Sequence, residues 1–213
     1  MLDRISEKVD LADRGHVVYN GVDTERFFPV PHESDGVVHL ISVGNLIPLK
    51  GHDLTIRALR ALLDKGYSAD LKIVGGGVLE NGLKTLASDL GIGDRVEFTG
   101  YVPYGDVCKL MQSSDVFVLP SWFEALGCVY LEAMACGLPV IGCYGNGIDE
   151  IITDGVNGML IENKNTEQLI EKLTELMDSE KRINMGNSAR ESAVKGFTWH
   201  SSASKLKRIY ELC

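Results

Sequence analysis

Short apolar runs alternate with stretches of helical periodicity along most of the chain. Six runs are apolar on both faces, the pattern expected of strands that are buried on both sides of a sheet. The predicted strands cover residues 37–44, 70–75, 95–100, 115–120, 138–143 and 157–162. The predicted helices cover residues 53–66, 78–91, 105–114, 125–137, 147–155, 166–179, 180–197 and 198–213.

One helix separates each strand from the next, which predicts a parallel sheet with helices on both faces. The predicted fold class is α/β, a doubly wound, Rossmann-like parallel sheet of about six strands with additional C-terminal helices. We find no internal repeat and no linker-like change of composition, so residues 1–213 are expected to form a single domain. Its polar start, residues 1–36, is expected to be a loosely packed lead-in.

Composition narrows the classes of partner. With 21 Lys and Arg against 30 Asp and Glu, the formal charge is -9, which argues against nucleic acid as a partner. No uninterrupted apolar run reaches the roughly 18 residues of a membrane span, and no signal peptide is recognisable. The cysteines form no CxxC pair and are expected to be reduced thiols in a cytoplasmic protein. They are Cys108, Cys128, Cys136, Cys143 and Cys213.

Ligands of doubly wound sheets bind beyond the carboxyl ends of the strands, where this sequence places loops such as "VGGG" (74–77) and "CYGNG" (143–147). The glycines of 74–77 suit either a phosphate or simply a tight turn. They do not complete a dinucleotide fingerprint, because the third glycine is replaced by Glu80. Lys50, just before a predicted helix, is either a phosphate ligand or a solvated charge.

The stretch "EALGCVYLE" contains two carboxylates, Glu124 and Glu132. If a helix begins near Leu126 or Gly127, Glu124 lies outside its N-terminus and Glu132 roughly 8 Å further along its axis. The free N–H groups between them suit a diphosphate, and each carboxylate suits hydroxyl groups, as in a sugar nucleotide. The alternative is that Glu124 caps the helix and Glu132 forms a salt bridge with an arginine.

The sequence predicts no metal site, because no His, Cys, Asp or Glu residues have the spacing of a ligand set in the predicted loops. The histidines are scattered and are interpreted as structural or exposed, with His52 as a cap or packing residue near a helix start. They are His16, His32, His39, His52 and His200.

Several motifs occur together and in order: "ISVGNLIPLKGHDLTIRAL", "KIVGGG", "DRVEFTGYVP", "SDVFVLPSWFEALGCVYLEAMACGLPVIG" and "DGVNGMLI". They resemble the C-terminal, donor-binding domain of family 4 retaining glycosyltransferases of the GT-B fold, whose E-x7-E motif the two glutamates match. The resemblance runs from about Asn20 to Phe197. It implies that the chain is one half of a GT-B fold and lacks the N-terminal, acceptor-binding domain.

The resemblance also implies roles for individual residues. Glu124 would contact the donor sugar, Glu132 the ribose hydroxyls, and Lys50 the diphosphate, with Glu124 and Lys50 as the catalytic candidates. The other implied donor-binding residues, of which Tyr101 and Val102 would meet the base, are Gly44, Asn45, Gly76, Tyr101, Val102, Ala125, Leu126, Gly127, Cys128 and Val129.

Two stretches depart from the family pattern. Asn45 stands where family members often carry arginine, which leaves one positive charge fewer at the diphosphate. The chain has "EALG" where "EGFG" is usual, so Ala125 and Leu126 change the volume near the sugar. Either departure is expected to change donor choice or to weaken binding.

The implied activity is hexosyl transfer from a UDP-, GDP- or other nucleotide sugar to a sugar, lipid or other acceptor, with retention of configuration and without a metal or other cofactor. Protein groups would stabilise the charge that develops on the leaving diphosphate. The full-length enzyme could be peripheral at a membrane. Two alternatives remain open: a stand-alone, non-catalytic module that binds nucleotide sugars, and one half of a GT-B-like epimerase or phosphorylase.

Overall fold

Within residues 15–31 and 34–211, which the computed structural model describes, six parallel strands form one sheet in the order β3-β2-β1-β4-β5-β6. The predicted parallel sheet of about six strands is therefore confirmed. The strands are β1 (Val38–Val43), β2 (Ala69–Val74), β3 (Val96–Gly100), β4 (Val116–Val118), β5 (Val140–Cys143) and β6 (Met159–Ile161).

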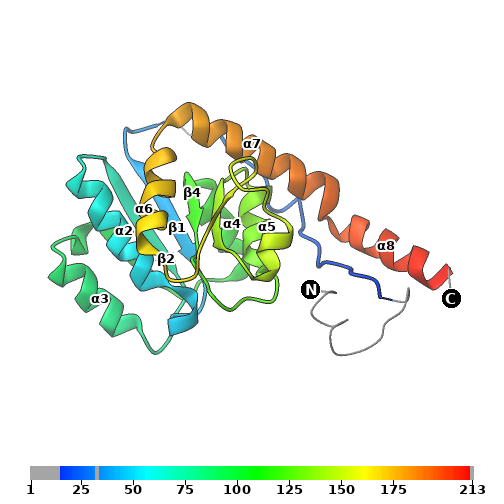
Figure 1. The fold of residues 1–213 in the computed structure, drawn as a ribbon, viewed down its shortest axis with the longest axis horizontal. Coiled ribbons are helices and arrows are strands. Elements are labelled where there is room, and N and C mark those ends of the chain that lie inside the picture. The colour runs from blue at the N-terminus through cyan, green and yellow to red at the C-terminus, as the bar shows by residue number, and fades with distance from the viewer. Residues whose placement is uncertain (1–14, 32–33, 212–213) are drawn as a thin grey trace.

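Helices follow the strands where the periodicity predicts them, except between β5 and β6 (Figure 1). The α-helices are α2 (His52–Asp64), α3 (Glu80–Asp89), α4 (Tyr104–Gln112), α5 (Cys128–Ala135), α6 (Thr166–Glu175), α7 (Ser179–Gly196) and α8 (Trp199–Glu211). The described part of the chain also contains three short 3-10 helices, η2 (Pro48–Lys50), η3 (Gly93–Arg95) and η4 (Gly147–Glu150).

The predicted helix at 147–155 is wrong, because only the 3-10 turn η4 forms there. The side chain of Asn157 explains where the helical pattern stops. Its Oδ1 accepts from the N–H of Thr153 at 2.7 Å, and its Nδ2 donates to the carbonyl of Ile151 at 3.2 Å. These backbone groups are therefore engaged by a side chain instead of by a continuing helix.

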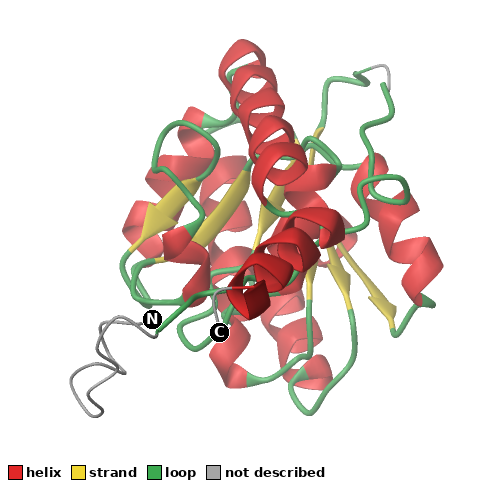
Figure 2. Cartoon of the chain, turned by 90° about the vertical axis from the view of Figure 1, so that its right-hand side faces the viewer, coloured by secondary structure: helices red, strands yellow, loops and turns green. Residues whose placement is uncertain are grey.

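Each face of the sheet is covered by its own set of helices, as Figures 1 and 2 show. One core combines strand residues such as Leu40 and Ile73 with α2, α3 and α6. The other combines Ile41 and Phe117 with α4, α5 and α7. The neighbours Leu40 and Ile41 belong to different cores because successive side chains of a strand point to opposite faces. This burial on both faces is the reason why the strand runs lack a polar side.

Part of the N-terminal lead is firmly packed. Phe27 is fully buried in the core beside α4 and α5. The N–H of Val22 donates to the carbonyl of Phe197 at 2.7 Å, and Arg190 of α7 donates to the carbonyl of Phe27 at 2.8 Å. For this part of residues 1–36 the expectation of loose packing is wrong, because an aromatic side chain fills a core position. Residues 1–14, 32–33 and 212–213 lie outside the described residues.

Helix α8 extends beyond the layered body, and its described side chains are all at least partly exposed (Figure 1). Trp199, Leu206 and Tyr210 are the large exposed hydrophobic side chains on it. Neither α8 nor any other helix in the described part of the chain has the length and apolar character needed to cross a membrane.

Candidate functional site

From β1 the strands β2 and β3 are added on one side of the sheet, and β4, β5 and β6 are added on the other. The topological switch point therefore lies between the central strands β1 and β4. Loops that leave the carboxyl ends of these two strands diverge and open a crevice, the usual ligand position in such sheets. A cavity of about 350 Å³ lies there. It is lined by Val43, Gly44, Asn45, Lys50, Tyr104, Val107, Glu124, Gly127, Cys128, Val129 and Glu132.

Lys50 and Glu124 form an ion pair in this cavity, with side chains that are 18% and 17% exposed. The loop after β1 is tied to the loop after β4, because the hydroxyl of Ser121 donates to the carbonyl of Leu49 at 3.0 Å. Gly51 has a left-handed backbone (φ 69°), and a Cβ there would lie 2.6 Å from the carbonyl oxygen of Pro120. This tight junction fixes the backbone on both sides of Lys50, and the ion pair with Glu124 means that its ammonium group is not a freely solvated charge.

The loop after β5 holds Glu124 from the other side. The N–H of Glu124 donates to Oδ1 of Asn146 at 3.0 Å, and the N–H of Gly147 donates to the carbonyl of Glu124 at 3.2 Å. A Cβ on Gly147 would overlap the carbonyl oxygen of Ala125, so this approach requires glycine. We did not predict Asn146 or Gly147 as site residues, although the loop "CYGNG" lies at a strand end where ligands are expected.

Helix α5 begins at Cys128, one residue beyond the predicted limit at Gly127. Gly127 is the N-cap with a left-handed backbone (φ 71°), and no side chain caps the helix. The interpretation of Glu124 as a helix cap is therefore wrong. No hydrogen bond among the described residues engages the N–H groups of Gly127, Cys128 and Val129. These groups, at the positive end of the helix, are available to an oxygen-rich anion.

Glu132, further along α5, accepts a hydrogen bond from the hydroxyl of Tyr104 at 2.8 Å. Its partner is thus a tyrosine and not the arginine of the alternative interpretation. Burial raises the pKa of Glu132, and the hydrogen bond from Tyr104 opposes that rise. Burial and the bond to Glu132 raise the pKa of Tyr104, so its hydroxyl stays protonated. We did not predict Tyr104, because no spacing rule indicates a contact between α4 and α5.

The glycine loop after β2 is explained by close packing. A Cβ on Gly75 would overlap the carbonyl oxygen of Gly44, and one on Gly76 would lie 2.5 Å from the ring of Tyr101. The hydroxyl of Tyr101 also donates to the carbonyl of Gly76 at 3.1 Å. These contacts favour the tight-turn interpretation of the loop. The predicted residues that do not line the cavity are Gly76, Tyr101, Val102, Ala125 and Leu126.

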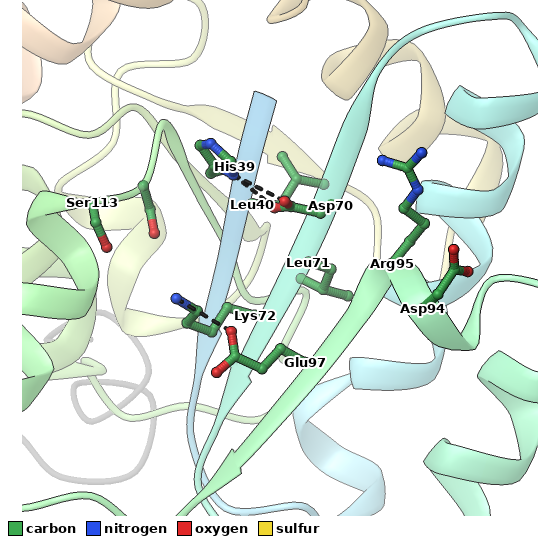
Figure 3. A pocket seen from close by; sticks show the side chains of 10 residues that line it. His39, Leu40, Asp70, Leu71, Lys72, Asp94, Arg95, Glu97 and Ser113 are labelled. Carbon is green, nitrogen blue, oxygen red and sulfur yellow. Dashed lines mark hydrogen bonds and ion pairs between the residues drawn. The ribbon is translucent and has the colours of Figure 1, made fainter. Parts of the chain in front are cut away.

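Another cavity, of about 340 Å³, lies at the amino ends of the strands, where β1, β2 and β3 begin (Figure 3). Two pairs of its charged groups are in contact: His39 Nδ1 lies 2.9 Å from Asp70, and Lys72 Nζ lies 3.4 Å from Glu97. Burial favours the neutral ring, but the hydrogen bond and charge of Asp70 outweigh it and raise the pKa of His39. The amino ends of parallel strands are not the usual ligand position, and we assign no function to this groove.

His52 is a packing residue, as predicted. It is 1% exposed, its Nδ1 lies 3.0 Å from the hydroxyl of Ser42, and burial lowers its pKa to about 4. Among residues 15–31 and 34–211, no three His, Cys, Asp or Glu side chains are grouped so that they could hold a metal ion. The cysteines in that part of the chain are free thiols.

The strand order and the switch-point cavity place the chain in the class of Rossmann-like α/β domains. The model of the family described as "Glycosyl transferases group 1" matches residues 23–192, and the chain belongs to this family. The predicted resemblance to glycosyltransferases is therefore confirmed.

The curated relatives of this chain are about twice as long as the chain itself. The chain is 32% identical over 206 residues to the GDP-mannose-dependent alpha-(1-6)-phosphatidylinositol monomannoside mannosyltransferase of Mycolicibacterium smegmatis. That alignment covers 89% of this chain and 54% of the relative, so the chain spans about half the length of such relatives.

Solved structures confirm the fold as one half of GT-B. The C-terminal domain of a glycosyl transferase group 1 family protein from Francisella tularensis superimposes with a TM-score of 0.76 at 24% identity, covering 84% of this chain and 99% of that domain. Anabaena HepE in complex with UDP-glucose superimposes with a TM-score of 0.80 at 25% identity, covering 92% of this chain and 56% of HepE.

Proposed function

We propose that this chain binds the nucleoside-diphosphate sugar donor of a retaining hexosyltransferase. The observation that carries the proposal is that one cavity is lined by Lys50, two carboxylates and the N-terminus of α5, where no described residue engages the N–H groups of residues 127–129. Membership of the glycosyl transferases group 1 family supports glycosyl transfer as the activity. The relative from Mycolicibacterium smegmatis uses GDP-mannose, and Anabaena HepE binds UDP-glucose, which supports a nucleotide sugar as the ligand.

The diphosphate would bind the N–H groups of residues 127–129 and the ammonium of Lys50. Both are positive or partly positive, and both are already fixed before a ligand arrives. Glu124 would accept hydrogen bonds from hydroxyls of the transferred sugar, and Glu132 from hydroxyls of the ribose. The two carboxylates would thereby set the direction of the donor, with the sugar near the loop after β4.

Charge would develop on the leaving diphosphate as the bond to the sugar breaks. Lys50 and the N-terminus of α5 would stabilise that charge without reorganising, which is the efficient form of electrostatic catalysis. We propose that no metal and no other cofactor takes part. Retention of configuration follows from the resemblance to family 4 enzymes and belongs to the same proposal.

The nucleotide base would lie against the loops that carry Gly76, Tyr101 and Val102. These residues are outside the cavity lining, so this part rests on the resemblance alone. Asn45 does line the cavity and brings an amide where family members often have an arginine. Ala125 and Leu126 belong to the loop that Gly147 fixes, and their size would influence which hexose fits.

An acceptor-binding domain would complete the enzyme, and a sugar, a lipid or another acceptor would bind between the two halves. We propose that the complete enzyme works in the cytoplasm, at a membrane surface where the acceptor is a lipid. The chain alone is then expected to bind the donor without transferring the sugar.

Calorimetric titration of the chain with UDP, GDP, ADP and TDP in EDTA tests the proposal. We expect one nucleotide to bind at least about tenfold more tightly than the others, since a base-specific site differs by 1.4 kcal/mol or more. We also expect that magnesium does not change its affinity. Absence of binding by all four nucleotides would contradict the function. Binding that requires magnesium would contradict the metal-free mechanism.

A further inference from the structure

Tyr104 and Glu132 present two oxygen acceptors to the same cavity. The Tyr104 hydroxyl donates to Oε1 of Glu132 at 2.8 Å, and both residues line the cavity. Oε2 of Glu132 has no hydrogen-bond partner among the described residues. A carboxylate in this state has room for at least one more donor.

The hydrogen bond fixes what each group can offer to a ligand. Tyr104 commits its proton to Glu132 and keeps its lone pairs, so its oxygen can only accept from a ligand. Oε2 of Glu132 is likewise an acceptor. Two acceptors that are joined by one hydrogen bond suit a ligand with two neighbouring hydroxyl donors, such as the 2′- and 3′-hydroxyls of ribose.

The surroundings hold Tyr104 in this position. Its ring centroid lies 5.6 Å from that of Phe27, which is fully buried, and the guanidinium of Arg26 lies 5.4 Å from the same ring. One turn further along α4, Cys108 donates to the carbonyl of Arg26 at 3.0 Å. Because the ring is fixed on one side and 53% of the residue stays exposed, its hydroxyl is offered before a ligand binds.

We propose that Tyr104 binds one hydroxyl of the ribose diol while Glu132 binds the other, so that the site selects ribonucleotides over deoxyribonucleotides. This inference rests on the proposed donor function, in which Glu132 alone contacts the ribose. Tyr104 is then a specificity-determining residue that no motif of the sequence marks.

The test is titration of the wild-type chain, Tyr104→Phe and Glu132→Gln with the preferred nucleoside diphosphate and with its 2′-deoxy and 3′-deoxy analogues. The wild type should prefer the ribonucleotide over both analogues. Tyr104→Phe should reduce the preference at one hydroxyl about 3- to 10-fold, the usual weight of one hydrogen bond. Glu132→Gln should reduce the preference at the other hydroxyl. The melting temperature of Tyr104→Phe should stay near that of the wild type, because the ring keeps its packing.

Tyr19→Phe is the matched control. Tyr19 also donates its hydroxyl to a glutamate, Glu150, but neither residue lines the cavity. This variant should leave the preference for ribose unchanged.

Three results would overturn the inference while leaving the donor function intact. The first is equal binding of the ribonucleotide and both analogues by the wild type, or a preference of the wild type for TDP, whose sugar already lacks the 2′-hydroxyl. The second is an unchanged preference in Tyr104→Phe. The third is tighter ribonucleotide binding by Tyr104→Phe, which would mean that the hydroxyl obstructs the site. Failure of the wild type to bind any nucleotide would contradict the donor function itself, and the inference with it.

Discussion

Lys50 and Glu124, separated by 74 residues in the sequence, are each other's counter-ion across the switch point between β1 and β4. Each would be left as a poorly hydrated, unpaired charge if the other were removed. The proposed diphosphate would add negative charge beside the same ammonium. Lys50 therefore holds Glu124 in place and, in our proposal, also attracts the donor.

Replacing Lys50 should separate these two effects. Lys50→Met should weaken binding of the preferred nucleoside diphosphate by about 1–3 kcal/mol, because a charged donor is lost. Binding of the free nucleoside should hardly change. The double variant Lys50→Met/Glu124→Gln should bind the diphosphate more tightly than Lys50→Met, since no unpaired carboxylate then repels it. Titration calorimetry measures the affinity of Lys50→Met for the nucleoside diphosphate and for the nucleoside, and that of the double variant for the nucleoside diphosphate. If Lys50→Met lost equal affinity for the nucleoside and the nucleoside diphosphate, the role of Lys50 would be purely structural.

The two glutamates should affect different parts of the donor. Glu132→Gln should weaken the nucleoside diphosphate and the sugar nucleotide alike, by about 1–2 kcal/mol, because a charge-assisted bond becomes neutral. Glu124→Gln should weaken only the sugar nucleotide. Titration of both variants with both ligands decides the matter. A Glu124→Gln variant that binds both ligands as the wild type does would remove Glu124 from the sugar site.

Gly147 should be intolerant of a side chain. Gly147→Ala should destabilise the fold by about 1–3 kcal/mol, as overpacking usually does, and should weaken sugar-nucleotide binding because the loop with Glu124 must move. Gly82→Ala is the control, since Gly82 lies in α3 with open space around it and alanine favours a helix. Urea unfolding and calorimetry provide the readouts. Equal behaviour of the two variants would contradict the close approach of Gly147 to Ala125.

His52 should make the protein sensitive to mild acid. Its folded-state pKa of about 4 lies below the ordinary value of 6.5, so the unfolded chain binds more protons between these pH values. The free energy of unfolding should therefore fall as the pH drops through this window. His52→Gln should reduce the loss of stability between pH 7 and pH 5 by about 2 kcal/mol, measured by urea unfolding at both pH values. The same loss in variant and wild type would argue against a neutral, buried His52.

The alternation of strands and helices could be predicted because burial acts on every strand in the same way. Residues such as Leu40 and Ile41 face different cores, and both must be apolar. The ends of elements were less predictable. Gly127, directly before α5, has a left-handed backbone. A glycine in the sequence does not by itself show whether that residue lies inside the helix or before it. At 147–155 a side chain, that of Asn157, stops the helical pattern.

The candidate site was predictable in its residue types more than in its pairings. The motif that contains Glu124 and Glu132 indicated two carboxylates beside a helix N-terminus. The contact of Glu124 with Lys50 depends on β1 and β4 being neighbours, and the contact of Glu132 with Tyr104 depends on how α4 packs on α5. Both depend on tertiary arrangement, which local periodicity does not encode.

The N-terminal lead segment contacts the start of α8 along a seam formed by Gly21, Val22, Thr198 and Trp199. This seam determines where the domain can be cut when it is joined to another protein. The family match ends at residue 192, whereas Val22 pairs with Thr198 and the backbone at Gly21 leaves no room for a side chain beside Trp199. A fragment cut at the limits of the family match would lose both halves of this seam at once. A chimera that is to keep these contacts must therefore include residues 21–22 as well as residues 198–199.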